Sequence, residues 1–102
     1  MTAGSGLQHS EMFPLVNEGK PNPLDLFQIW INLPKASKFV DPHYKMLWSE
    51  DIPVIQSQDQ NGRSTSIRII AGDLDGYQAP DPAPDSWARA AGNQVAIWLL
   101  TM

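Results

Sequence analysis

The sequence has no cysteine, few histidines and few charged residues. Of its 102 residues, Cys accounts for 0 and His for 2, and only 18% are Asp, Glu, Lys or Arg. Without cysteine, a disulfide framework, a thiolate nucleophile and a cysteine-based zinc site are all excluded. Any metal would have to be held by His, Asp and Glu. We expect a cytoplasmic protein whose stability depends on packing alone.

Long apolar runs and an excess of positive charge are also missing. No apolar run approaches the roughly 18 residues of a membrane-spanning helix, and no charged-then-apolar leader opens the sequence, so we expect no membrane association. The formal net charge is −4, from 7 Lys and Arg against 11 Asp and Glu. This negative field would repel phosphate, so we expect no direct nucleic-acid binding.

What the sequence does contain is apolar and frequently interrupted. Hydrophobic residues make up 42%, including four Trp, which is too many for a disordered chain. Nine Pro and seven Gly exclude long helices and favour strands separated by turns. The length allows one small domain or a piece of a larger one. We therefore expect an all-β fold.

Four segments in the first three quarters of the chain are predicted to be strands. Residues 24–33 (LDLFQIWINL) form the strongest, because Ile, Trp and Phe dominate and, apart from Asp25, one face of the segment is apolar. Residues 7–13 are long enough for one short strand. Residues 52–56 and 64–71 are predicted to pair as a hairpin, because Asn61-Gly62 between them is a strong turn signal.

The last quarter of the chain combines a linker, a short helix and a strand. Residues 78–84 (QAPDPAP) resemble an extended polyproline connector. Asp85 is predicted to cap a helix over residues 86–91 that Gly92 ends. Residues 94–101 (QVAIWLLT) are predicted to be an apolar strand, which either joins the preceding sheet or begins a second one.

His9 and Glu11 are the strongest candidates for chemistry. Side chains two apart in a strand point to the same face, so the imidazole and the carboxylate would lie side by side. Together they are a plausible half of a metal site for Fe(II), Mn or Zn. The alternatives are an exposed strand face or a simple His–Glu hydrogen bond, because His-x-Glu is a weak pattern.

The other candidates have simpler interpretations. His43 is predicted to be a surface or turn histidine. Glu50 and Asp51 are adjacent, so their side chains diverge, and we interpret them as solvated loop charges. Asp73 and Asp75 resemble a fragment of a calcium loop, but the remaining ligand spacing is missing.

Three long stretches of the sequence resemble the pirin family of cupin proteins. They are residues 1–14 (MTAGSGLQHSEMFP), 22–54 (NPLDLFQIWINLPKASKFVDPHYKMLWSEDIPV) and 67–88 (IRIIAGDLDGYQAPDPAPDSWA), the last followed by an apolar strand. The stretches occur in the family's order and cover nearly the whole chain.

The resemblance implies a metal site. Pirins contain two cupin β-barrels in tandem, and the first binds a divalent metal, typically iron, through three histidines and a glutamate. Two of the histidines belong to a His-x-His pair on an early strand, while the third histidine and the glutamate form a His-x-Glu pair that His9 and Glu11 match. This sequence contains no His-x-His. One chain is therefore expected to hold only half of the family's site.

The resemblance also implies a division of the chain. Residues 1–77 correspond to the second half of the first barrel, residues 78–93 to a Pro-rich linker with a short helix, and residues 94–102 to the opening strand of the second barrel. The expected fold is an all-β, truncated, partial cupin barrel (a double-stranded β-helix or jelly roll). Because such a half-barrel leaves sheet edges uncovered, we expect an intertwined homodimer, with a swap of residues 94–101 as one route. A two-fold dimer could also bring two copies of His9 and Glu11 together.

Three functional hypotheses follow from the resemblance. Family members have been described as iron-dependent quercetin 2,3-dioxygenase-like oxygenases and as metal-dependent transcription cofactors; in the oxygenase, Glu11 would be the base for the flavonol hydroxyl proton. We favour a non-catalytic pirin-like protein that acts through a protein partner and keeps a residual half-site for Fe2+ or another divalent metal. The third hypothesis is a shortened reading frame whose upstream DNA encodes the missing pair.

Overall fold

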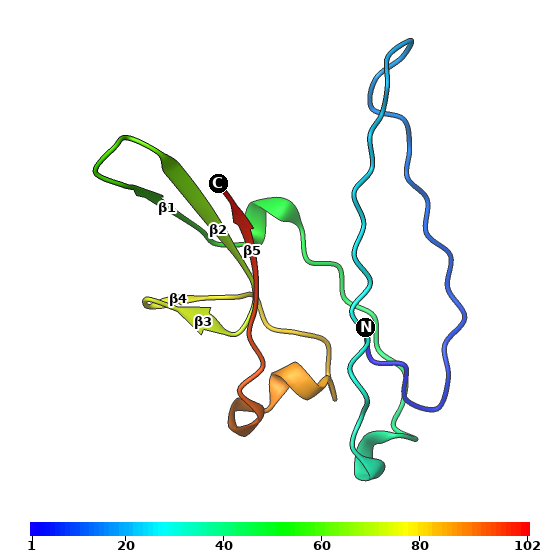
Figure 1. The fold of residues 1–102 in the computed structure, drawn as a ribbon. Coiled ribbons are helices and arrows are strands. Elements are labelled where there is room, and N and C mark those ends of the chain that lie inside the picture. The colour runs from blue at the N-terminus through cyan, green and yellow to red at the C-terminus, as the bar shows by residue number, and fades with distance from the viewer.

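The computed structural model describes residues 1–102, except for the side chain of Ala91. In this described chain, regular structure consists of strands and single 3-10 turns, without an α-helix (Figure 1). This confirms the prediction of an all-β protein. In chain order the elements are η1 (Lys35–Ser37), η2 (Ser49–Asp51), β1 (Val54–Gln58), β2 (Ser64–Ala71), β3 (Asp73–Leu74), β4 (Tyr77–Gln78), η3 (Trp87–Arg89), η4 (Ala91–Asn93) and β5 (Ile97–Thr101).

A three-stranded antiparallel sheet with the order β1-β2-β5 forms one side of the molecule. Ile67 of β2 lies opposite Ile55 of β1 and Leu100 of β5, so apolar side chains align across the three strands. The predicted hairpin of β1 and β2 is confirmed, although β1 begins two residues later than expected. The final strand joins this sheet, which is one of the two outcomes that the sequence left open.

Asp59 holds the turn between β1 and β2. Its Oδ1 accepts hydrogen bonds from the backbone N–H groups of Asn61 (2.8 Å) and Arg63 (2.9 Å), and its Oδ2 accepts one from Arg63 Nε at 2.7 Å. Gly62 adopts a left-handed conformation with φ of 79°. The turn signal at Asn61-Gly62 therefore acts together with an aspartate that binds the two backbone donors.

A second, two-stranded hairpin of β3 and β4 follows the sheet directly. Asp75 and Gly76 connect the two strands with φ of 49° and 83°, the positive values that a two-residue hairpin turn requires. Gly72, just before β3, has φ of 78° and lies against the backbone of Val95. This close approach lets the chain turn away from the sheet while β5 remains beside β2.

The predicted helix over residues 86–91 is replaced by two 3-10 turns. Asp85 has a φ of 55°, which is not the extended conformation of a helix cap. Ser86 caps η3 instead, because its side chain accepts a hydrogen bond from the backbone N–H of Ala88 at 3.3 Å. A single turn of this kind cannot continue without the packing support that longer helices have.

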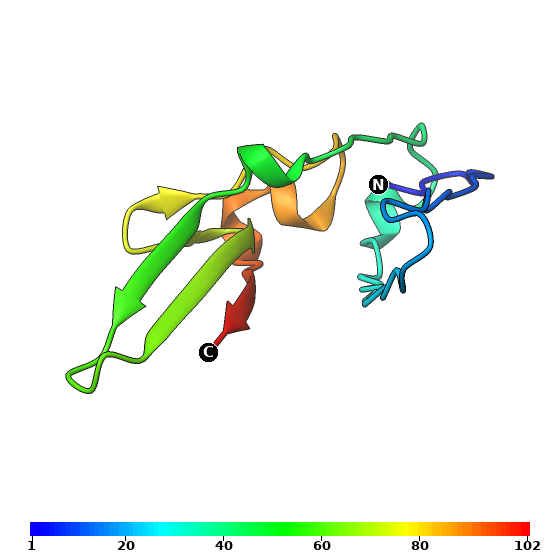
Figure 2. The same cartoon turned by 90° about the horizontal axis from the view of Figure 1, so that it is seen from above.

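The predicted strands at residues 7–13 and 24–33 are not paired. Residues 7–15, here called the first arm, and residues 24–33, the second arm, form two long legs of the chain that reach away from the sheet (Figures 1 and 2). In the described chain neither arm makes a backbone–backbone hydrogen bond. The prediction of strands at residues 7–13 and 24–33 is therefore wrong for the described chain, because a strand needs a hydrogen-bonded neighbour and neither arm has one.

Asn22 ties the far ends of the two arms together. Its Oδ1 accepts from the backbone N–H groups of Val16 (3.0 Å) and Asn17 (2.8 Å), and its Nδ2 donates to the carbonyls of Asn17 (2.8 Å) and Lys20 (3.0 Å). One side chain thus satisfies four backbone groups in the loop. The two arms are therefore joined at their far ends, while the backbone along each arm makes no backbone–backbone hydrogen bond in the described chain.

The described chain buries little of its own surface. Its buried hydrophobic residues are Ile69 and Ala83, while Phe27 and Trp30 of the second arm are 82% and 90% exposed. The accessible surface is 8621 Å², against about 5,700 Å² for a compact protein of this mass. The radius of gyration is 16.7 Å, where a compact chain of this length has about 13 Å. The chain therefore exposes about 2,900 Å² more accessible surface than a compact protein of its mass. A partner could cover this excess surface.

No helix in the described residues is both long and apolar enough to cross a membrane.

Candidate metal-ligand pair

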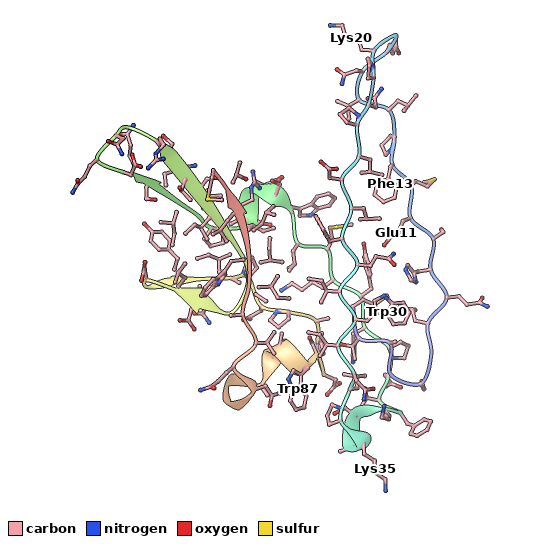
Figure 3. All side chains as sticks on the ribbon, viewed as in Figure 1. Glu11, Phe13, Lys20, Trp30, Lys35 and Trp87 are labelled. Carbon is pink, nitrogen blue, oxygen red and sulfur yellow. The ribbon has the colours of Figure 1, made fainter. Side chains whose placement is uncertain are left out.

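His9 and Glu11 lie on the first arm with their side chains on one side of the chain. His9 Nε2 is 3.9 Å from Glu11 Oε1, and the side chains are 42% and 51% exposed. Figure 3 shows Glu11 and Phe13 on the side of the first arm that faces the second arm. The alternation expected of a strand is therefore present although the arm is not hydrogen-bonded in a sheet. The two polar groups are therefore about half exposed and are not part of a core.

The donor set of this pair fits a divalent metal only in part. An imidazole nitrogen and a carboxylate oxygen suit Fe(II), Mn or Zn, and their separation allows both to approach one ion. Such ions take four or more ligands. Within the described residues no group of three or more potential ligands gathers at one place. His9 and Glu11 can therefore supply two ligands of a site and not a whole one.

His43 lies in a different part of the molecule. Its Nε2 is 3.4 Å from Asp85 Oδ2, and its backbone pairs with Thr2 in both directions, at 2.8 and 2.9 Å. Thr2 is buried, and its hydroxyl donates to the carbonyl of Pro84 at 2.7 Å. This cluster connects the base of the arms to the linker before η3. Sequence reasoning missed it, because no local pattern links residues that lie 40 or more positions apart.

The remaining acidic candidates lie in a 3-10 turn, at the start of a strand and in a hairpin turn. Glu50 and Asp51 are exposed in η2. Asp73 begins β3, and Asp75 occupies the left-handed position of the β3–β4 turn. The partial resemblance of these two aspartates to a calcium loop is explained by the turn, since Asp tolerates that conformation.

Two cavities lie away from the His9–Glu11 pair. One, of about 320 Å³, lies between the β3–β4 hairpin and the η3–η4 turns, and the other, of about 420 Å³, lies between those turns and η1. Arg89 lines both. Neither of these two cavities is lined by His9 or Glu11.

The fold and the candidate site together define a general class, an all-β protein with a candidate His-x-Glu metal-ligand pair. Comparison with known proteins identifies the family within that class. Pirin-1 of Arabidopsis thaliana is 44% identical over 82 residues, pirin of Rattus norvegicus is 37% identical over 79, and a Pseudomonas aeruginosa protein with the provisional name quercetin 2,3-dioxygenase is 35% identical over 80. Each comparison covers 78% of this chain. The resemblance seen in the sequence is confirmed: this chain belongs to the pirin family.

The chain spans about a quarter of the length of these relatives, between 24% and 27% of each. No family model matches it. No solved structure matches it either.

Proposed function

We propose that this chain is a pirin-type cupin segment that supplies two ligands, His9 and Glu11, to a divalent metal site and acts through contacts with a protein partner. The observation that supports it is the 3.9 Å separation of an imidazole and a carboxylate on one side of an uncovered arm. When bound, Fe2+ or a similar ion would supply Lewis-acid chemistry there. His9 and Glu11 would hold and orient it.

The chain on its own is proposed to be non-catalytic. Two ligands leave an ion weakly held, and the pair lies outside both cavities, so a bound substrate would not be shielded from water. The remaining ligands and the cover of the arms would come from outside this single copy of residues 1–102. A cytoplasmic location belongs to the same proposal.

The architecture we propose is the one that the resemblance implies. Residues 1–77 would form half of a cupin barrel, residues 78–93 a linker and residues 94–102 the first strand of a second barrel. An intertwined homodimer would complete the barrel. The large uncovered surface of the arms and the open edges of the sheet support such an association.

The test is metal binding measured on the purified chain. Titration calorimetry with Mn2+ or Zn2+, followed by elemental analysis, should show binding that His9→Gln or Glu11→Gln reduces at least tenfold. His43→Gln is the matched control, because His43 lies in the separate cluster with Asp85, and it should leave binding unchanged. Equal loss in the three variants, or no binding by the native chain, would contradict the proposal.

An oxygenase is the second candidate. It is favoured by the similarity to the Pseudomonas aeruginosa protein with the provisional dioxygenase name. In that function Glu11 would accept the hydroxyl proton of a metal-bound flavonol. An anaerobic Fe2+ loading followed by addition of air and quercetin distinguishes the two: steady flavonol loss that depends on Glu11 supports the oxygenase, and no loss above free Fe2+ supports the non-catalytic function.

A further inference from the structure

We infer that Asn61, in the β1–β2 turn, is a site of covalent modification at which the backbone nitrogen of Gly62 converts the side-chain amide into a carboxylate. The inference is independent of the proposed metal site, because the turn is a separate element. Three features of the turn carry it: an exposed asparagine, a glycine directly after it, and an aspartate that restrains the reacting peptide group.

The first feature is the accessible side chain of Asn61. Both Asn61 and Gly62 are exposed. The backbone N–H of Asn61 donates to Asp59 Oδ1 at 2.8 Å, but no hydrogen bond holds its side-chain amide in the described chain. The side-chain amide of Asn22, by contrast, makes four hydrogen bonds, and Asn93 Nδ2 donates to a backbone carbonyl at 2.8 Å. The Cγ atom of Asn61 is therefore open to a nucleophile.

The second feature is the glycine that follows Asn61. Because Gly62 has no Cβ, its nitrogen can approach the Cγ atom of Asn61 without the steric conflict that a side chain would cause. The other four asparagines of this sequence precede larger residues, in the pairs Asn17-Glu18, Asn22-Pro23, Asn32-Leu33 and Asn93-Gln94. Asparagine is one of the chemically labile residues, so Asn61 should be the fastest of the five to react.

The reaction needs only water and base. The Gly62 N–H gives its proton to solvent base, and the nitrogen forms a bond to Asn61 Cγ. The bond between Cγ and the side-chain nitrogen breaks, and ammonia leaves, which produces a five-membered succinimide. Water then opens this ring. Attack at Cγ gives aspartate, whereas attack at the backbone carbonyl carbon gives isoaspartate, in which the main chain runs through the former side chain.

The third feature is the hold of Asp59 on the reacting peptide group. The Gly62 N–H donates to the carbonyl of Asp59 at 3.0 Å, and the carbonyl of Gly62 accepts from Gln58 Nε2 at 2.9 Å. The proton that must leave is therefore engaged in a hydrogen bond. The turn has to open locally before the nitrogen can attack, so the Asp59 side chain, which binds two other N–H groups of the turn, slows the reaction.

The modification changes the turn in two ways. A carboxylate at position 61 places a second negative charge two residues from Asp59. Isoaspartate also adds an atom to the main chain, which displaces the Arg63 N–H from Asp59 Oδ1, its acceptor at 2.9 Å. Because β2 is the central strand of its sheet, the modified chain should unfold at a lower temperature than the unmodified one.

The first experiment follows the whole chain during storage at mildly alkaline pH by peptide mass spectrometry. The peptide with Asn61 should gain one mass unit at least tenfold faster than the peptide with Asn17. Asn17 is the matched control, because it is exposed and no hydrogen bond holds its side chain in the described chain, but Glu18 follows it. A protease that cleaves before aspartate and not before isoaspartate should reveal both products. Equal rates at the two asparagines, or no gain at Asn61, would overturn the site.

The second experiment tests the restraint. Asp59→Ala removes the side chain that holds the turn, and it should accelerate the modification of Asn61 at least threefold. Asp51→Ala is the matched control, because Asp51 is an exposed acid in η2, outside the hairpin, and it should leave the rate unchanged. An unchanged rate in Asp59→Ala would overturn the restraint by Asp59.

A measurement in concentrated urea separates the folded turn from the local sequence. With the chain unfolded, the native sequence and Asp59→Ala should react at Asn61 at equal rates, since the turn that distinguishes them is gone. Equal rates in urea, together with a faster variant in buffer, support the restraint. A difference that persists in urea would show a direct chemical effect of the neighbouring carboxylate and would overturn it.

Discussion

Single polar side chains hold the loops of this protein, and Asp59 and Asn22 are the clearest examples. Asp59 binds two backbone N–H groups in the β1–β2 turn, and Asn22 satisfies four backbone groups at the tip of the arms. Neither residue is buried, yet the side chain of each supplies hydrogen bonds to the loop backbone; in the β1–β2 turn these add to the backbone bonds from Asp59 N–H to Arg63 O and from Gly62 N–H to Asp59 O. Local order therefore persists in regions that have no core beneath them.

Asp59 should make the β1–β2 hairpin sensitive to acid. The backbone N–H of Arg63 and then its guanidinium hold the pKa of the Asp59 carboxyl below its ordinary value of 3.8. Because the pKa is lowered on folding, the stabilisation is complete above the ordinary value and is lost as the pH falls through the lowered one. A carboxyl titration by NMR should show a midpoint below 3.8.

The variant Arg63→Ala separates the two causes. It removes the guanidinium but keeps the backbone N–H, which is the larger cause, so the midpoint should rise only partway toward 3.8. A midpoint that returns fully to the ordinary value would show that the guanidinium alone sets the pKa.

At the scale of elements, the passage from the sheet into the β3–β4 hairpin depends on glycine. Gly72 and Gly76 both have positive φ, at 78° and 83°. A Cβ on Gly72 would lie 2.6 Å from Val95 O and 3.1 Å from Ala96 Cα, whereas a Cβ on Gly76 would meet nothing within 4 Å. The two positions thus share the backbone strain but differ in the space available.

Gly76→Ala should lower the free energy of unfolding by about 1–2 kcal/mol, which is the conformational cost alone. Gly72→Ala should lower it further, because the backbone leading into β5 must also move away. Urea titrations of the two variants and the native chain measure the difference. Equal losses would show that β5 does not need the close approach at Gly72.

The β3–β4 hairpin also shows a signal that the sequence contained and that was interpreted too loosely. Asp75-Gly76 is a strong two-residue hairpin signal, yet Asp73 and Asp75 were interpreted only as a fragment of a calcium loop. The strands on either side have two residues each, too short to stand out as a pattern. A turn motif was therefore more informative here than hydrophobic periodicity.

At the scale of the whole molecule, the dominant feature is the large solvent-exposed surface, which no other part of the described chain buries. The sheet and the arms lie apart in Figure 1, and the arms add length but little burial. Hydrogen bonds join Thr2 to His43 and to Pro84 across the chain. A protein with so little core should be only marginally stable as a single copy. Association would then provide much of the stability.

The thermal midpoint should therefore rise with protein concentration, as it does for any protein whose folded state associates. Each copy carries a net charge of −4, so two copies repel each other, and added salt should strengthen the association by screening this repulsion. Differential scanning calorimetry over a hundredfold range of concentration, at low and high salt, measures both effects. A midpoint independent of concentration would show that the single copy is stable by itself.

The sequence by itself determined the class of fold, the family and the pair of candidate ligands. Proline and glycine excluded long helices, the Asn61-Gly62 signal located the main hairpin, and the alternation around Ser10 put His9 and Glu11 on one side. These are local properties, because turn chemistry and the direction of side chains depend on residues only a few positions apart. Local patterns are also why residues 24–33 were predicted to be the strongest strand, which the structure does not form.

Only the tertiary structure decided which extended segments have neighbours. It placed β5 beside β2, left both arms unpaired, and brought Thr2, His43 and Pro84 together across the chain. Pairing depends on which distant segment supplies the facing hydrogen bonds, and a hydrophobic pattern is the same whether or not that segment is present. For the same reason the ligand pair was visible in the sequence, whereas its open and half-exposed setting was visible only in three dimensions.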